Sequence, residues 1–112
     1  MVSIEVFIRL ATGFEAAEEH PHFEKKSFRV NKKIFATLDV KNKRAVVKLS
    51  AVDQSVFCSY DKNIIYPANG KWGLHGWTMI ELEKIKKPML QDALTTSYCN
   101  TAPKRLTEKY IK

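Results

Sequence analysis

Two stretches of strict alternation, residues 33–39 and 44–49, constrain the fold of this chain more than any other feature of its sequence. Small and aliphatic side chains recur there at every second position, which is the spacing of a β-strand with one covered face. The side expected to be covered carries Ile34, Ala36, Leu38, Ala45, Val47 and Leu49. The side expected to stay open carries Lys33, Phe35, Thr37, Asp39, Arg44, Val46 and Lys48. The two stretches therefore predict neighbouring strands of a sheet that other elements must cover on one side.

A further strand is expected immediately before them, over residues 24–30. The connections between the three strands would be Asn31-Lys32 and residues 40–43. Both contain asparagine, which tolerates the left-handed backbone angles that tight hairpin turns need. Three strands joined by two short turns predict an antiparallel three-stranded meander.

Helix start signals lie on both sides of this meander. Ser3 is expected to cap a first helix that ends at Gly13, and Pro88 suits the first turn of a helix that continues to about residue 100. Ser50 and Asp53 resemble a capping box and predict a short helix to about residue 60. The side chains that this short helix is expected to bury are Val52, Val56, Phe57 and Tyr60.

Between and beyond these elements the patterns are weaker. The pieces expected there are a connection at residues 14–22, an extended piece at 63–67, a glycine-rich loop or hairpin at 68–76, a strand at 77–82 and a basic turn or helix from residue 103. At 112 residues, the chain has the length of one domain, residues 1–112. The predicted fold class is α+β, with helices packed on an antiparallel sheet.

The net charge of +7 is concentrated in the predicted meander. Residues 25–50 contain nine basic residues and one acidic residue, whereas residues 1–24 contain one basic and five acidic residues. The basic residues of this block are Lys25, Lys26, Arg29, Lys32, Lys33, Lys41, Lys43, Arg44 and Lys48. Such a block favours an anionic partner, and the alternative is that the lysines keep the protein soluble and protect the sheet edges.

The loop at residues 68–76 adds Lys71 and Trp72 to the candidate residues. A loop tryptophan beside a lysine can stack on a base or insert into a groove of nucleic acid, and it can equally close a small hydrophobic cluster. Trp77, at the head of the next strand, is expected in the core. The spacing of Gly70, Gly73 and Gly76 matches no phosphate-binding loop, so they are interpreted as turn glycines.

Chemistry beyond binding finds little support in the sequence. His20 and His22 have one further histidine, the distant His75, whereas a metal site needs three or four ligands. Cys58 lies on an apolar helix and has no evident base with an orienting third group. The sequence therefore predicts no catalytic centre, no metal and no cofactor, while a small molecule bound near Trp72 and His75 stays an open alternative.

The expected location is the cytoplasm. No apolar run approaches the roughly 18 residues that a membrane-spanning helix needs, and no membrane partner is expected. Cys58 and Cys99 lack the spacing of a zinc site, and no secretion signal precedes them. They are therefore expected to be reduced thiols.

Several words of the sequence, in this order, resemble the YjbR-like (MmcQ/YjbR) family of small bacterial proteins. They are "PHFEKKSFRVNKKIFATL" (21–38), "VVKLS" (46–50), "DQSVFC" (53–58), "YPANGKWGLHGWTMIEL" (66–82) and "APKRL" (102–106). The resemblance implies a small α+β domain in the frataxin-like or secretion-chaperone-like group of folds. The family is commonly labelled DNA-binding, and it supplies no agreed functional residues.

The function expected from these observations is non-enzymatic binding of double-stranded DNA without sequence preference. The basic meander and its turns would contact phosphates, which give affinity but no choice of sequence. The alternative is a protein- or peptide-binding adaptor that uses the open sheet face, with Phe35 and Val46 as contact residues.

Overall fold

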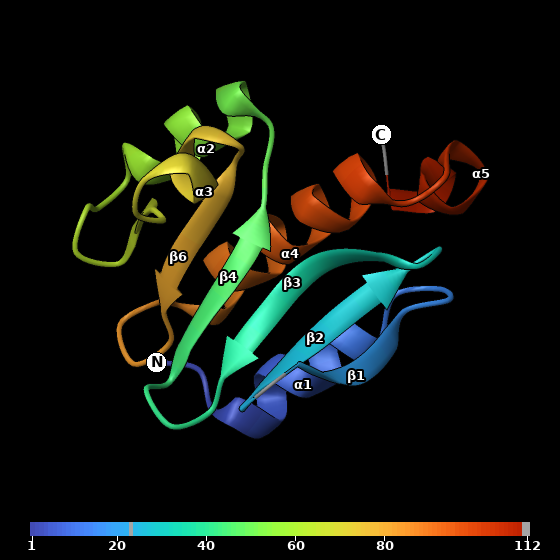
Figure 1. The fold of residues 1–112 in the computed structure, drawn as a ribbon, viewed down its shortest axis with the longest axis horizontal. Coiled ribbons are helices and arrows are strands. Elements are labelled where there is room, and N and C mark those ends of the chain that lie inside the picture. Colours follow the sequence, from blue (N-terminus) through green and yellow to red (C-terminus); the bar gives the residue numbers. More distant parts are fainter. Residues whose placement is uncertain (23, 111–112) are drawn as a thin grey trace.

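A six-stranded antiparallel sheet with the strand order β1-β2-β3-β4-β6-β5 forms the centre of the computed structural model, which describes residues 1–22 and 24–110 (Figure 1). The strands are β1 (Glu18–His22), β2 (Lys25–Val30), β3 (Lys33–Asp39), β4 (Arg44–Lys48), β5 (Ile65–Pro67) and β6 (Trp77–Glu81). The helices are α1 (Ile4–Thr12), α2 (Ala51–Cys58), α3 (Lys71–Leu74), α4 (Lys87–Thr101), α5 (Lys104–Thr107) and the 3-10 helix η1 (Glu108–Tyr110). The predicted α+β class is confirmed.

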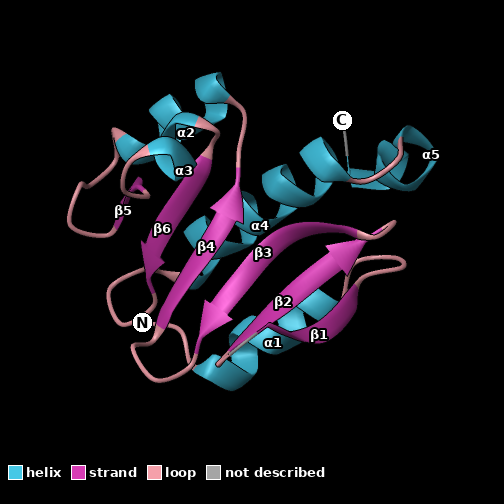
Figure 2. Cartoon of the chain, viewed as in Figure 1, coloured by secondary structure: helices cyan, strands magenta, loops and turns pink. Residues whose placement is uncertain are grey.

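Helices α1 and α4 cover one face of the sheet, and the core lies between them and the strands (Figure 2). Phe7 of α1 meets Phe28 of β2 edge to face, with ring centroids 5.6 Å apart. Helix α4 packs across β3 and β4 and buries Leu90, Leu94 and Tyr98. In the described part of the chain no helix crosses the centre of the opposite face, which we call the open face, and α2 and α3 lie at one of its corners.

A β-bulge in β3 changes which side chains face the core. Phe28 pairs with Ala36 and Arg29 pairs with Ile34, so Phe35 is the extra residue. Phe35 is fully buried and meets Tyr98 edge to face at 5.6 Å, whereas Ile34 is half-buried on the open face. The expectation that Ile34 is covered and Phe35 open is therefore wrong, because the bulge shifts the alternation by one residue. The alternation of β4 is confirmed.

Ser97 of α4 enters the sheet beside this bulge. Strands β3 and β4 pair from Ala36 with Val47 to Asp39 with Arg44. One step beyond this ladder, the Ser97 hydroxyl donates to the backbone oxygen of Phe35 at 2.6 Å and accepts from the backbone N–H of Lys48 at 3.1 Å. A helix side chain thus stands between two backbone groups that would otherwise continue the ladder.

Two further expectations need correction. Residues 14–22 are not only a connection, because Glu18–His22 forms the edge strand β1 against β2 and the meander has four strands. Val52, Val56 and Tyr60 are exposed rather than buried. Helix α2 is held instead by the side-chain amide of Gln54, whose Nε2 donates to the backbone oxygen of Gly73 at 3.0 Å and to Thr78 Oγ1 at 3.1 Å.

The predicted helix starts are confirmed. Ser3 Oγ accepts from the backbone N–H of Val6, and Ser50 Oγ accepts from that of Asp53, each at 3.1 Å. Pro88 lies in the first turn of α4, which has 15 residues. None of the described helices combines the length and the apolar character needed to cross a membrane.

Candidate nucleic-acid interface

Eight of the nine basic residues of block 25–50 separate into three groups in the structure. Lys32 and Lys33 lie at the β2–β3 turn, and Lys41 and Lys43 lie at the β3–β4 turn. Consecutive turns of a meander fall at opposite ends of the strand that they share, here the seven-residue β3, so the two turns are roughly 20 Å apart (Figure 1). The side chains placed on the open face are Lys25, Arg29, Arg44 and Lys48, while Lys26 pairs with Glu19 at 2.8 Å.

The β3–β4 turn gains basic neighbours from a distant part of the chain. The backbone N–H of Leu82 donates to the backbone oxygen of Lys43 at 3.1 Å, which places the β6–α4 connection beside this turn. We call the resulting group the basic end; its members, all exposed, are Lys41, Lys43, Lys84, Lys86 and Lys87. Within it, Lys43 Nζ lies 4.0 Å from a carboxylate oxygen of Glu83. The sequence reasoning missed Lys84, Lys86 and Lys87, because only the β4–β6 pairing brings them to the turn.

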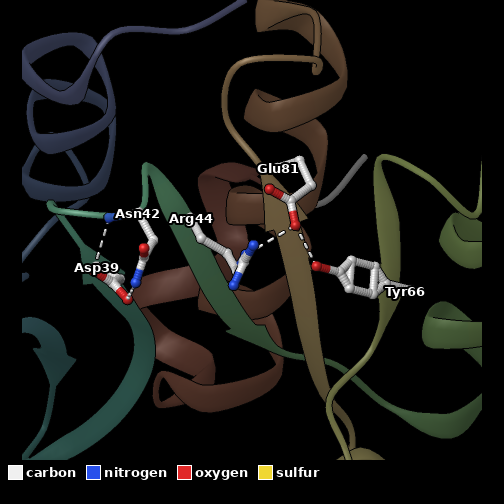
Figure 3. Close-up of polar contacts among 5 residues, drawn as sticks. All are labelled: Asp39, Asn42, Arg44, Tyr66 and Glu81. Atoms are coloured by element: carbon white, nitrogen blue, oxygen red, sulfur yellow. Dashed lines mark hydrogen bonds and ion pairs between the residues drawn. The ribbon is translucent and has the colours of Figure 1, made fainter.

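Arg44 is held by neighbours on the open face (Figure 3). Its Nε donates to Glu81 Oε2 at 2.8 Å, and the Tyr66 hydroxyl donates to the same oxygen. The hydrogen bond to Glu81 raises the pKa of Arg44. The pKa of Tyr66 is raised mainly by burial and also by its hydrogen bond to Glu81. Arg44 is thus compensated by Glu81 and is less available to a phosphate than the exposed lysines.

A groove runs over the open face beside these charges. Its larger hollow, of about 440 Å³, has an apolar floor that includes Ile34, Val46 and Trp77, and Trp72 and Lys25 border it. A second hollow of about 210 Å³ shares Ile34 and Trp77 with the first and adds Lys33, Lys48, Asn100 and Thr101. We call the two together the open-face groove. Its floor can receive a flat apolar group, and lysines stand at both ends.

Trp72 borders the groove on a turn that glycine residues fix in place. Gly70 and Gly76 have φ angles of +64° and +98°, which side chains rarely adopt. A Cβ atom on Gly73 would lie 2.1 Å from the backbone oxygen of Ala68, so the turn sits directly on its neighbour. The interpretation as turn glycines holds for Gly70 and Gly76, whereas Gly73 lies within the four-residue helix α3, which interrupts the expected loop. Trp72 is 67% exposed on this closely packed segment.

Trp77 lies on the open face rather than in the core. It pairs with Lys48 of β4 and is half-buried. Lys48 Nζ lies 5.2 Å from the centroid of its ring, within cation–π range. The expectation of a core tryptophan is wrong, because the first residue of β6 points away from α4.

Comparison with known proteins assigns this chain to a family. The YjbR family model matches residues 12–100. The chain belongs to the YjbR family. A crystal structure of Deinococcus radiodurans protein DR2400, domain DUF419, superposes on this YjbR protein with a TM-score of 0.77 at 17% identity, over 100% of this chain and 83% of that chain. None of the curated proteins matches the chain at a significant level.

The thiols and histidines of this YjbR protein are the side chains that could react or hold a metal. Cys58 and Cys99 are half-buried free thiols, and burial raises the pKa of each. His20 Nε2 lies 3.2 Å from Glu18 Oε1, and the side chain of His22 lies outside what the structure describes. Among the described residues, no group of three or more His, Cys, Asp or Glu side chains is placed to hold a metal ion.

Proposed function

We propose that this YjbR protein binds double-stranded DNA without choosing a sequence, through phosphate contacts at the basic end. One observation carries the proposal: two segments about 40 residues apart in the chain bring five exposed lysines to the same end of the sheet. Exposed lysines contact phosphates as point charges, and such contacts do not depend on the base sequence. They also add to the attraction of a protein whose net charge is +7.

The basic end does not have the geometry that reads the sequence of bases. Direct readout requires a helix or strand pair that enters the major groove with side chains such as Arg, Asn or Gln. The basic end consists instead of a turn, a connection and the first residue of α4, and its named cations are all lysines. Binding is therefore expected to depend on salt rather than on sequence.

Charge reversal tests the proposal. The double variant Lys84→Glu/Lys86→Glu is compared with the control Lys104→Glu/Arg105→Glu, whose exposed residues lie in α5 at the other end of the molecule (Figure 1). Both variants change the net charge equally, from +7 to +3. Fluorescence anisotropy with a labelled duplex should show at least about tenfold weaker binding for the first variant and a smaller loss for the control. Equal losses, or no binding by the wild type at low salt, would contradict the proposal.

A further inference from the structure

We propose that the open-face groove binds unpaired bases of single-stranded nucleic acid, with Trp72 as the stacking platform. This inference rests on the proposed function for its phosphate contacts and adds a second site, distinct from the basic end. It predicts that a single strand binds more tightly than a duplex, because paired bases are enclosed in their own stack.

Trp72 has the properties of a prepared stacking surface. The residue is 67% exposed, although tryptophan is among the residues that gain most from burial. The turn that carries it is held by Gln54, which bonds to Gly73 and Thr78, and by the close approach of Gly73 to Ala68. The ring is therefore carried by a well-held segment, so the backbone loses little conformational entropy when a base stacks on the ring.

The floor below Trp72 has the size and chemistry for a planar ring. The larger hollow, of about 440 Å³, falls within the roughly 300–1,000 Å³ range of small-molecule sites. Ile34, Val46 and Trp77 supply apolar surface, and Asn69 supplies an amide that can bond to the edge of a base. A base that leaves water here gains apolar contact and keeps a polar partner.

The charges around the groove fit a polyanion. Lys25 borders the larger hollow, Lys33 and Lys48 border the smaller one, and none of the described side chains lining either hollow is Asp or Glu. Lys25 also faces Asp39 across the sheet and lies toward the β3–β4 turn. A strand bound at the basic end therefore meets Lys25 before it reaches the two tryptophans.

An extended peptide fits this place less well. Peptides that bind a sheet commonly add a strand at an edge, where backbone groups are unpaired. The groove lies instead over β3, β4 and β6, which are interior strands of the described sheet. Its binding groups are side chains, two of them aromatic and several cationic, which is the combination used by single-strand binders.

The first experiment measures anisotropy of a labelled oligothymidylate of about 12 nucleotides, a length within the usual site sizes for single strands, and of a duplex of the same length. Trp72→Ala should weaken binding of the oligothymidylate by about fivefold or more and leave duplex binding unchanged. Leu74→Ala is the matched control, because Leu74 lies in the same helical turn, is 87% exposed and does not line the groove. It should change neither affinity.

The second experiment uses an abasic oligomer with the same number of phosphates. The wild type should bind it at least about fivefold more weakly than the oligothymidylate, and Trp72→Ala should cause no further loss. Equal binding of the two oligomers, or equal effects of Trp72→Ala and Leu74→Ala, would overturn the inference. Tighter binding of an acidic, phenylalanine-containing peptide, lost in Trp72→Ala, would also overturn it and make the groove a peptide site.

The two proposals fail in different ways. If the Lys84/Lys86 reversal abolishes duplex binding and Trp72→Ala has no effect on any probe, only the groove inference is wrong. If the wild type binds the oligothymidylate through Trp72 but binds neither duplex nor abasic oligomer at low salt, the groove inference stands and the phosphate-binding function is wrong.

Discussion

Arg44 and Glu81 lie directly opposite each other on β4 and β6, with Arg44 Nε 2.8 Å from Glu81 Oε2. The pair belongs to the open face, and Tyr66 completes it by donating to the same carboxylate oxygen (Figure 3). In the sequence, Arg44 is one of nine basic residues in block 25–50. In the structure, its charge is paired within a hydrogen-bonded network with Glu81 and Tyr66. The distinction leads to a prediction about what Arg44 contributes.

Arg44→Ala should reduce stability more than DNA affinity. The substitution leaves the carboxylate of Glu81, whose side chain is 18% exposed, without its cation. We expect the free energy of unfolding to fall by about 1–3 kcal/mol, measured by urea denaturation. Duplex affinity of the folded variant should change less than in Lys84→Glu. A variant with unchanged stability and strongly reduced affinity would show that Arg44 contacts phosphate.

The tyrosines predict a loss of stability at high pH. Burial raises the pKa of both Tyr66 and Tyr98 above the ordinary value of about 10. The folded state therefore holds the two phenol protons more tightly than the unfolded state does. The resulting contribution to the free energy of unfolding is fully present below pH about 10 and is lost as the pH rises through the folded-state pKa. Urea unfolding across this range should show the loss, and Tyr66→Phe should lose less. An equally steep loss in that variant would exclude Tyr66 as a source.

The bulge in β3 predicts unequal costs for two adjacent truncations. Phe35→Ala removes a fully buried ring that meets Tyr98 and Phe14, and it should lower the free energy of unfolding by about 3–5 kcal/mol. Ile34→Ala removes a half-buried side chain from the open face and should cost clearly less. Chemical denaturation of the two variants measures both. A larger cost for Ile34 would mean that the alternation continues through this point.

Salt dependence gives a measure of how many phosphates the basic end engages. If three to five of its lysines make contact, the logarithm of the duplex association constant should fall against the logarithm of the salt concentration with a slope of roughly −3 to −4.5. Lys84→Glu/Lys86→Glu removes two contacts and should make the slope shallower by about 1.8. Anisotropy titrations at several salt concentrations provide both slopes. An unchanged slope would place the contacts elsewhere.

Features decided within a few residues could be predicted from the sequence. Ser3 and Ser50 cap helices because a hydroxyl placed before a helix reaches a backbone N–H three residues ahead, whatever the rest of the fold does. The bounds of β3, which spans Lys33–Asp39, were also predicted correctly from its local pattern and its turns.

Features decided by distant partners could not be predicted. The bulge depends on how β2 pairs with β3, and β1 becomes a strand only because β2 offers it an edge. The basic end has the same origin, since the sheet order brings Leu82, two residues before Lys84, to the backbone of Lys43. Charge counted along the chain identified the meander as basic, but the grouping of the lysines required the β4–β6 pairing.

The position of Ser97 couples local unfolding of the sheet at Lys48 to displacement of helix α4. The amide of Lys48 is bonded to a hydroxyl of α4 rather than to a strand. Hydrogen exchange at a backbone amide reports the smallest unfolding event that frees it. For Lys48 that event includes displacement of α4, so this strand amide should exchange together with the helix, and the sheet and α4 should behave as one cooperative unit at this point.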